Sequence, residues 1–527
     1  MKSAFSTAAT VAVAAATVQP IWPNPLRDDN RATVGVNIGG WLVLEPWITP
    51  SLFYRFLGKT RSDGIGIDTY TFCQALGAEE ANKVLRAHWD AWVTEDHIKQ
   101  LADREVEIVR LPIGDWTLRQ YETYQDCTTG ADEKVQWLLD TADKYGIKVL
   151  LDVHGVKDSQ NGFDNSGKSV PFTWIDENNF THANAHGEWM GPWNGSSYDY
   201  IKQENIDWAV ETVDMLVDKW GKHPALFAIE PVNEPWWNSD LNVLKDFYRR
   251  VRTNMRNKAP HLHFVFHDAF HWDASEWNDL FADNDKDNVI MDTHQYMAWW
   301  SEHWDVDSLM RDYKSNITNT ARQVKYPVWV GEWALATDQC AFWLEGFNNF
   351  NGTDKHQCQW VDCPYSYLPE EFAVDFDRTA DMLGPYGEDQ QKRSVVKKGK
   401  CSIDSDFYGE SDVYKLGQSL IETFNQATEG HFMWTFRNEL EPRWNYITAY
   451  DNGWIKNGGR QESPVEDEPA NTQYKWLEKC ELKTMDFCDG SCDCWFSAPE
   501  NEDFLGPDAA CRCRPSSYEM PEPEPQE

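Results

Sequence analysis

The sequence predicts an α/β fold, a (β/α)8 barrel with long βα loops. Eight short, β-rich apolar runs alternate with amphipathic helical segments between about residues 33 and 435. Most of these runs are too apolar to face water on either side, which is typical of parallel strands covered by helices. The eight expected strands cover 34–37, 107–112, 148–153, 226–231, 263–268, 288–293, 328–332 and 431–436.

Amphipathic segments between the runs are the expected crossover helices. They include 79–104, 132–146 and 244–258, and each ends at Gly, Pro or a charged turn. Two connections are long, with about 45 residues after the third run and roughly 80 after the seventh, from Ala334 to Tyr414. Loops of that size in a compact domain are usually functional or pinned by disulfides.

The barrel is expected to span residues 30–465, with other kinds of segment on either side. In residues 1–19 a lysine precedes an Ala/Val-rich run, which predicts a secretory signal peptide. Six cysteines between Cys480 and Cys513 predict a small disulfide-stapled module over 475–515, followed by an acidic, proline-rich tail over 516–527. The C-x-C spacing lacks the paired C-x2-C of a zinc ribbon.

Composition restricts the class of ligand. The formal net charge of -38 over 527 residues would repel phosphate backbones and excludes nucleic acid as an expected partner. The 28 tryptophans offer indole faces that stack on the C–H faces of sugar rings, so a neutral, hydroxyl-rich ligand suits this chain. No later stretch is apolar enough to predict a membrane span. Secretion is favoured by 12 cysteines and by four sequons, at Asn179, Asn194, Asn316 and Asn351.

Two glutamates stand at the ends of expected strands. Glu234 follows the fourth strand in FAIEPVNEPWW, whereas Glu230 lies within that strand and should point into a packed layer or the helix shell. Glu332 ends the seventh strand in VWVGEW. Strands four and seven lie across a closed barrel, so Glu234 and Glu332 can face one pocket and serve glycoside hydrolysis. The alternative interpretation is that both pair with buried Arg or His to close the barrel top.

Other polar residues also fall where expected strands end. In this fold the chemistry collects on the loops at the carboxyl ends of the strands. These residues are Asn37, Arg110, His154, Asn233, Asp268, His294 and Trp434.

Six motifs over residues 33–450 carry a family resemblance. The chain resembles glycoside hydrolase family 5 and, within it, the fungal and oomycete type of exo-β-1,3-glucanase. The motifs occur in family order: GVNIGGWLVLEPWITPSLF (35–53), VRLPIGDW (109–116), DVHGVKDSQNGFDNSG (152–167), PVNEPW (231–236), DTHQY (292–296) and GEWALATD (331–338).

The resemblance implies a retaining double displacement, with Glu234 as acid/base and Glu332 as nucleophile. Retention requires the two carboxyls to lie roughly 5 to 5.5 Å apart. We expect a raised pKa for Glu234, which must hold a proton, and a charged Glu332. Arg110 matches the family residue that holds the nucleophile.

The resemblance also implies a ring of substrate contacts. Asn233 would donate to the sugar 2-hydroxyl, and Trp434 would form the platform beneath the ring. Phe163 with Trp299 or Trp300 would clamp the next sugar. Further hydrogen-bonding residues are Glu45, His154, His294 and Tyr296. The last strand departs from the family, with Arg437 where a lysine is common, and this leaves the outer contacts open.

The sequence therefore predicts a secreted or cell-wall enzyme that removes glucose from β-1,3-glucan as a monomer, without cofactor or metal. Three alternatives stay open. The linkage could be β-1,6 or β-1,4, because loop shape decides it. The chain could be a catalytically dead glucan-binding wall protein. A metal-dependent hydrolase could use the H-x-H of residues 261–263 with Asp152, His154, Asp292 and His294.

Overall fold

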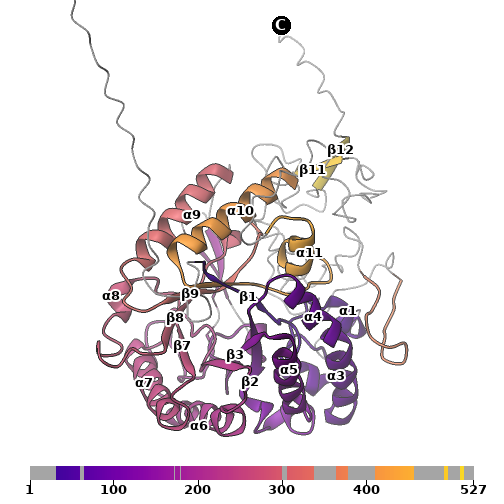
Figure 1. Cartoon of the computed structure of the whole chain (residues 1–527). Coiled ribbons are helices and arrows are strands. Elements are labelled where there is room, and N and C mark those ends of the chain that lie inside the picture. The colour runs from indigo at the N-terminus through magenta and orange to yellow at the C-terminus, as the bar shows by residue number, and fades with distance from the viewer. Residues whose placement is uncertain are drawn as a thin grey trace, which may run out of the picture.

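A closed barrel of eight parallel strands forms the centre of the protein, in the order β1-β10-β9-β8-β7-β6-β3-β2 (Figure 1). The computed structural model describes residues 31–57, 59, 64–170, 173–177, 180–184, 186–299, 306–337, 364–377, 410–455, 492–496 and 511–515. The barrel strands are β1 (Thr33–Asn37), β2 (Ile108–Gly114), β3 (Lys148–Gly155), β6 (Leu226–Glu230), β7 (His263–His267), β8 (Val289–His294), β9 (Val328–Trp333) and β10 (Gly430–Met433). The (β/α)8 prediction is confirmed.

Helices surround the ring of strands (Figure 1). The expected helix over 79–104 is in fact two, because the chain becomes extended at Val93 and Thr94 then caps the second helix. Its Oγ1 accepts from His97 N at 3.4 Å, and His97 Nδ1 accepts from Thr94 N at 3.2 Å, which closes a capping box. The main helices are α3 (Ala78–Trp92), α4 (Glu95–Asp103), α5 (Ala131–Tyr145), α6 (Gln203–Trp220), α7 (Leu241–Lys258), α9 (Val306–Ala321) and α10 (Glu410–Ala427), with the shorter α8 (Ala274–Trp277) and α11 (Tyr446–Asp451).

Two long connections carry structure of their own. The segment after β1 contains α1 (Pro50–Phe53) and α2 (Thr69–Leu76), and a disulfide from Cys73 to Cys127 ties α2 to the chain before α5. The segment after β3 contains an antiparallel pair, β4 (Thr173–Glu177) and β5 (Phe180–Asn184). Both segments lie at the carboxyl ends of strands, where they can shape a site.

Several predictions fall wholly or mostly outside the described residues. They are the signal peptide, the acidic tail and most of the connection between β9 and α10. Of the cysteine-rich module, only an antiparallel pair is described, β11 (Cys492–Phe496) with β12 (Cys511–Pro515). Within the described ranges, no helix is long and apolar enough to cross a membrane.

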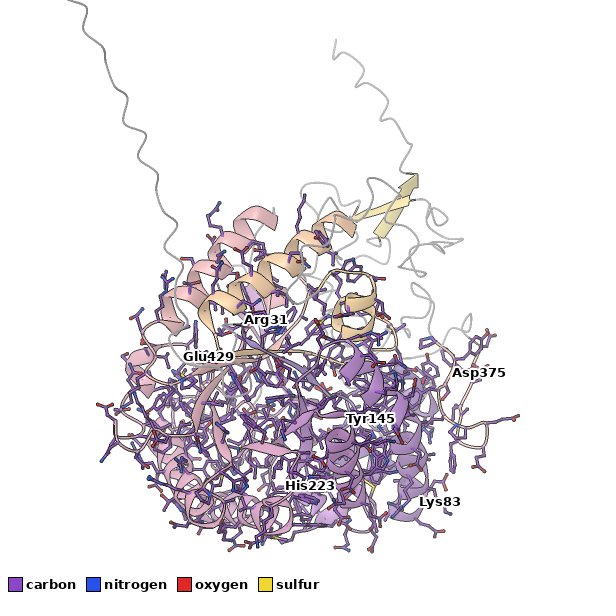
Figure 2. All side chains as sticks on the ribbon, viewed as in Figure 1. Arg31, Lys83, Tyr145, His223, Asp375 and Glu429 are labelled. Atoms are coloured by element: carbon purple, nitrogen blue, oxygen red, sulfur yellow. A yellow bond between two sulfur atoms is a disulfide. The ribbon has the colours of Figure 1, made fainter. Side chains whose placement is uncertain are left out.

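An apolar floor closes the barrel interior. Seven strands each contribute one buried side chain to it: Ile108, Leu150, Ala228, Val265, Ile290, Trp329 and Phe432. The eighth, β1, contributes Gly35, because a Cβ there would lie 2.1 Å from the Phe432 ring. A large cluster of buried apolar side chains packs around the ring, and Figure 2 draws the described side chains on the ribbon. The floor excludes water from below, so any polar group above it is solvated only from the open end.

Candidate active site

A polar layer lies directly above the apolar floor. Side chains alternate along a strand, so the residue two positions further also faces inward. Six of these positions are fully buried and polar: Asn37, Arg110, Asp152, Glu230, His267 and Asp292. On β9 the position is Gly331, where a Cβ would lie 2.1 Å from the Asp292 carboxylate. Along most of these strands the inward-facing side chains thus change from apolar to hydrogen-bonding within two residues.

Arg110 on β2 is the centre of this layer. Its guanidinium is fully buried, and every nitrogen of it has an oxygen partner. The planar fork explains why arginine serves here, since it bonds several oxygens in fixed directions. Nε donates to Glu230 Oε2 at 3.0 Å. Nη1 donates to Asn37 Oδ1 at 3.0 Å and to Glu332 Oε1 at 2.9 Å. Nη2 donates to Asn233 Oδ1 at 2.7 Å and forms an ion pair with Asp152 Oδ2 at 3.2 Å.

Glu230 lies in the packed layer inside the barrel, the first of the two positions expected from the sequence, and not in the helix shell. It faces the barrel interior and pairs with Arg110 beneath the site. Burial raises the pKa of Glu230 well above its ordinary value, although the charge of Arg110 opposes this. Glu230 is therefore part of the support of the site and is not at its surface.

Glu332 ends β9 with both carboxylate oxygens held. Oε1 accepts from Arg110 at 2.9 Å and Oε2 from Tyr296 Oη at 2.6 Å. The side chain is buried, and burial raises the pKa of Glu332, with His294 and Arg110 opposing and Glu234 adding to the rise. Two donors on opposite oxygens fix the plane of the carboxylate.

Glu234 reaches the same space from the loop after β6. Its backbone lies in the left-handed region, with φ of 44°, which is strained for a residue with a side chain. Oε1 accepts from His294 Nδ1 at 2.7 Å, and Oε2 accepts from Asn165 Nδ2 at 3.1 Å. The strained turn and Pro235 aim the carboxyl back into the barrel mouth.

The expected rise in the pKa of Glu234 is wrong for the free protein. Burial alone would raise it, but the hydrogen bond and charge of His294, with smaller contributions from His154 and Asn165, bring the pKa of Glu234 below its ordinary value. The pKa of His294 itself is raised well above its ordinary value, because Glu332 and Asp292 outweigh burial. In the free protein the shared proton therefore resides on the imidazole.

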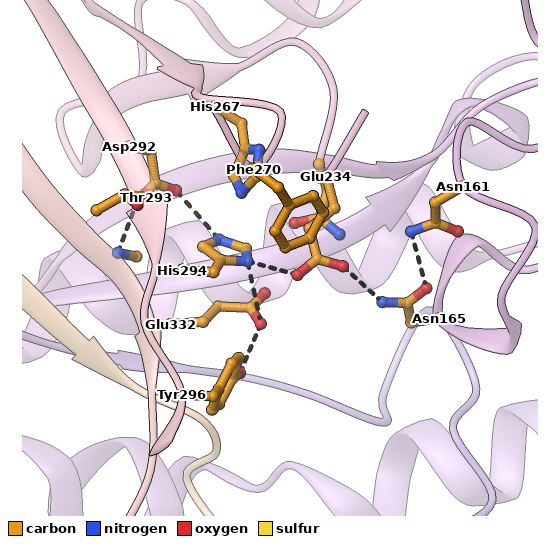
Figure 3. A network of polar contacts seen from close by, with 12 residues as sticks. Asn161, Asn165, Glu234, His267, Phe270, Asp292, Thr293, His294, Tyr296 and Glu332 are labelled. Atoms are coloured by element: carbon orange, nitrogen blue, oxygen red, sulfur yellow. Dashed lines mark hydrogen bonds and ion pairs between the residues drawn. The ribbon is translucent and has the colours of Figure 1, made fainter. Parts of the chain in front are cut away.

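His294 joins the two carboxyls (Figure 3). Its Nδ1 lies 2.7 Å from Glu234 Oε1 and 3.4 Å from Glu332 Oε2. These two oxygens are thus at most about 6 Å apart, the sum of the two distances. Separations of about 5 to 5.5 Å are typical of retaining glycosidases and about 6.5 to 9.5 Å of inverting ones. The upper limit on the distance between Glu234 Oε1 and Glu332 Oε2 therefore favours the retaining geometry.

Asn233 and His154 are positioned by the polar layer. Asn233 Oδ1 accepts from Arg110, so its Nδ2 must point the other way, where it donates to His154 Nε2 at 3.4 Å. His154 Nδ1 lies 2.5 Å from Asp152 Oδ2. Gln160 Nε2 bridges the backbone oxygens of His154 and Asn233 at 2.8 Å each. One Asn233 Nδ2 hydrogen is thus oriented by contacts that leave no choice of amide rotamer.

Glu45 and Trp434 stand near the same space. Glu45 Oε2 accepts from Trp47 Nε1 at 3.2 Å, and Oε1 has no hydrogen-bond partner among the described residues. Burial and the charges of Asp164 and Glu332 raise the pKa of Glu45 well above its ordinary value. Trp434 lies nearly parallel to the His154 ring, 5.3 Å between centroids. A buried, unpartnered carboxyl oxygen is costly unless a ligand bonds it.

Aromatic residues line the approach to Glu234. Phe163 packs against Trp236 at 4.8 Å between ring centroids, and Trp236 packs against Phe270 at 5.1 Å. Trp236 and Phe270 were not expected from the sequence. Trp299 ends a short 310 turn, Met297–Trp299, and its side chain lies outside the described part of the structure, as does Trp300.

Asn165 is the main site residue missing from the sequence prediction. It bonds Glu234 directly and is held by Asn161 Nδ2, which donates to its Oδ1 at 3.2 Å. Its position depends on a loop conformation that no periodic pattern encodes. By contrast Asp152 and Asp292 stand at alternate, inward-facing strand positions, a signal that could have identified the polar layer.

The loop that carries Phe163 and Asn165 is fastened to the α2 segment. Asp68 Oδ2 accepts from Ser169 N at 2.8 Å and from Ser169 Oγ at 2.5 Å. Gly167 O accepts from Tyr70 N at 2.8 Å, and a Cβ at Gly167, whose φ is 77°, would lie 2.1 Å from the Trp116 ring. The two segments are therefore joined by the Asp68 carboxylate and by one backbone hydrogen bond, and the close approach of Trp116 requires glycine at position 167.

Arg437 packs against the helices beside the barrel. Its guanidinium lies 4.0 Å over the Trp92 ring and donates to Trp92 O at 3.3 Å, on the helix side of the strand end. The departure from the family lysine therefore affects packing against α3.

A metal centre is not favoured by the donors that meet here. Glu234, His267 and His294 offer atoms within 4.8 Å of one another. His267 Nδ1, however, accepts from Ala269 N at 2.9 Å, so a neutral ring carries its proton on Nε2 and has no lone pair to give. His263 begins β7, at the other end of the barrel from Asp292 and His294, so the H-x-H alternative does not assemble.

Two carboxyls joined by one histidine, above a closed floor at the carboxyl end of a (β/α)8 barrel, define the class of protein as a glycoside hydrolase. The family model described as Cellulase (glycosyl hydrolase family 5) matches residues 73–371. The chain belongs to glycoside hydrolase family 5.

Two similar proteins are named glucan 1,3-beta-glucosidases, and one solved structure shares the fold. A glucan 1,3-beta-glucosidase of Blumeria graminis is 29% identical over 435 residues, 81% of this chain and 87% of the relative. Glucan 1,3-beta-glucosidase 2 of Wickerhamomyces anomalus is 31% identical over 428 residues, 78% of this chain and 84% of the relative. The crystal structure of rutinosidase from Aspergillus niger, 17% identical, covers 80% of this chain and 98% of its own with a TM-score of 0.54, which shows a shared fold.

Proposed function

We propose that this protein is a secreted, retaining exo-β-1,3-glucanase that removes terminal glucose from β-1,3-glucan. The substrate class is supported by the relatives, which are named glucan 1,3-beta-glucosidases. The observation that carries the mechanism is the approach of His294 Nδ1 to both carboxyls, 2.7 Å from Glu234 and 3.4 Å from Glu332. The two oxygens that His294 contacts are at most about 6 Å apart, which supports direct attack by Glu332 over attack by an intervening water.

Glu332 is the nucleophile and Glu234 the acid/base in this proposal. A Glu332 oxygen attacks the anomeric carbon, the bond to the leaving oxygen breaks, and that oxygen takes the proton of Glu234. In the second step Glu234 takes a proton from water, and the water oxygen displaces Glu332 from the same carbon. Arg110 and Tyr296 stabilise the departing carboxylate, since each donates to one of its oxygens.

The remaining contacts hold the terminal sugar. The free Asn233 Nδ2 hydrogen is aimed by Arg110 and donates to the 2-hydroxyl, a bond that strengthens in the transition state. Glu45 Oε1 accepts from a hydroxyl on the far side, and Trp434 forms the platform, with His154 behind it. Phe163, with Trp299 or Trp300, contacts the next sugar.

The test is a product time course on laminarin with anomer detection by NMR. We expect glucose as the first product, released as the β-anomer. Early α-glucose would contradict retention, and oligosaccharides as first products would contradict exo attack. Parallel assays on β-1,6- and β-1,4-glucan decide the linkage, and a protein that binds laminarin without releasing sugar would be a wall-binding protein.

The proton on His294 predicts a change in pH dependence. The 2.7 Å contact lets that proton pass to Glu234, so the pair keeps it until pH rises through the raised pKa of His294. In His294→Gln only a carboxyl can hold the proton. Without the imidazole, burial raises the pKa of Glu234, but it does so from an ordinary value well below that of imidazole, so the carboxyl still loses its proton at lower pH than the pair does. The alkaline limb of kcat/KM should therefore move to lower pH.

The matched control is His97→Gln. His97 lies beside Arg437, outside the site, and burial lowers its pKa to about 4. This variant should keep the wild-type limb. An unchanged limb in His294→Gln would show that His294 does not store the proton.

Secretion and domain division belong to the same proposal. The disulfide between Cys73 and Cys127 fits an oxidising compartment, as do the sequons. We propose an extracellular or cell-wall location, a monomeric catalytic region over 30–465, and a separate disulfide-stapled module over 475–515.

A further inference from the structure

Exposed aromatic residues gather on one side of the barrel mouth. Among the described residues four large apolar side chains are exposed: Tyr200 at 59%, Trp237 at 49%, Phe270 at 39% and Tyr365 at 76%. Tyr200, Trp237 and Phe270 lie on the connections after β3, β6 and β7, which are neighbours in the barrel. Single exposed apolar residues are common on protein surfaces. Three on neighbouring loops at the same barrel mouth are unusual and indicate a binding surface.

Trp237 is joined to the site by short contacts. It follows Trp236, whose ring packs against Phe163 and Phe270. Its backbone oxygen accepts from His271 Nε2 at 2.7 Å. The exposed indole therefore stands on a fixed backbone, three residues from Glu234.

The segment 186–200 extends this aromatic surface away from the site. His186 Nδ1 accepts from Asn238 Nδ2 at 2.7 Å, and the His186 ring packs against Trp193. Trp193 in turn packs against Tyr198 at 5.1 Å, and the two residues form a backbone bridge. Tyr200 lies just beyond this bridge, and two residues later Lys202 N donates to Met190 O at 2.9 Å.

The chemistry of this surface fits a neutral, hydroxyl-rich polymer. Indole and phenol rings offer apolar faces to sugar C–H groups and polar tips to hydroxyls. The net charge of -38 repels anionic polymers. A polymer whose terminal sugar lies beside Glu234 would continue across this surface. The ligand expected here is therefore the rest of the substrate chain.

We propose that Trp237 and Tyr200, together with Trp193, form an outer binding surface for polymeric β-glucan, on which sugars beyond the cleaved bond rest. The inference rests on the proposed function for the identity of the polymer. It adds that the enzyme prefers long chains over short substrates through contacts remote from the two carboxyls.

The test compares a polymer with a substrate too short to reach the surface. In the double variant Trp237→Ala/Tyr200→Ala, kcat/KM on laminarin should fall about tenfold, mainly through KM. On 4-nitrophenyl β-glucoside the change should stay below about twofold, because one sugar fills only the inner site. Tyr365→Ala, at an exposed aromatic on the segment before α10, is the matched control and should change neither value. Equal losses on both substrates, or no loss on laminarin, would overturn the proposal.

A binding experiment separates this inference from the proposed reaction. Laminarin in a native gel should retard Glu332→Gln, and the added Trp237→Ala/Tyr200→Ala changes should remove most of that retardation. Should the wild-type protein release no sugar from laminarin, the proposed reaction fails, while the gel still decides the surface. Unchanged retardation would overturn the surface whatever the activity.

Discussion

Replacing Glu332 with glutamine is expected to lower turnover on laminarin by about 10⁴-fold or more. The amide keeps the size of the side chain and can still accept from Arg110, but its oxygen is too weak a nucleophile to attack the anomeric carbon. The fold should persist, because the neighbours of Glu332 retain their positions and Arg110 keeps Glu230 and Asp152 as ionic partners. Steady-state rates with circular dichroism on the same preparation check both parts.

Glu439→Gln is the matched control for this loss. Glu439 is a second carboxyl with little water around it, and burial raises its pKa to about 7, although Ser51 donates to it from N and Oγ. The same chemical change there should leave turnover within about threefold. A Glu332→Gln protein that keeps a tenth of the normal rate would mean that another residue attacks the sugar.

Replacing Arg110 with methionine is expected to cost the largest loss of stability. The change leaves Glu230, Asp152 and Glu332 without their buried cation, and breaking a buried pair typically costs about 3 to 5 kcal/mol of unfolding free energy. Tm should fall by roughly 10 °C. Thermal unfolding followed by circular dichroism measures the fall, and activity should be lost with it.

Two comparisons make the Arg110 result specific. Lys83→Met breaks an exposed pair on the outer helix surface (Figure 2) and should leave Tm unchanged. Adding Glu230→Gln to Arg110→Met removes one orphaned carboxylate and should restore part of the lost stability. A single variant with wild-type Tm, or no recovery in the double variant, would show that the charges under the site do not balance one another.

The fold could be predicted because its signal is periodic. The apolar runs are long enough to be recognised singly, and their alternation with helices leaves few topologies. The break before Thr94 is not predicted because the apolar stripe continues across it, while the capping box that begins α4 depends on two side chains. Strand ends were placed to within three residues, which was enough to bring the right side chains to one rim.

The positions of site residues on strands could be predicted from the sequence. The position of a residue on a loop, and the protonation of Glu234, could not. Glu332 and His154 each lie one residue before the end of a strand, and Arg110 faces inward within β2, so all three follow from the strand pattern. Asn165 reaches Glu234 only through the turns of a loop, and the lowered pKa of Glu234 depends on an imidazole 60 residues later in the chain. Both depend on distances of a few ångströms between segments far apart in sequence.

The bonds from Ser169 to Asp68 and from Tyr70 to Gly167 join two stretches, 68–76 and 161–169, into one structural unit. Transfer of the loop that carries Phe163 and Asn165 to another barrel would therefore require transfer of both stretches together. Moved alone, the second stretch would arrive without its anchor and Asn165 would no longer meet Glu234.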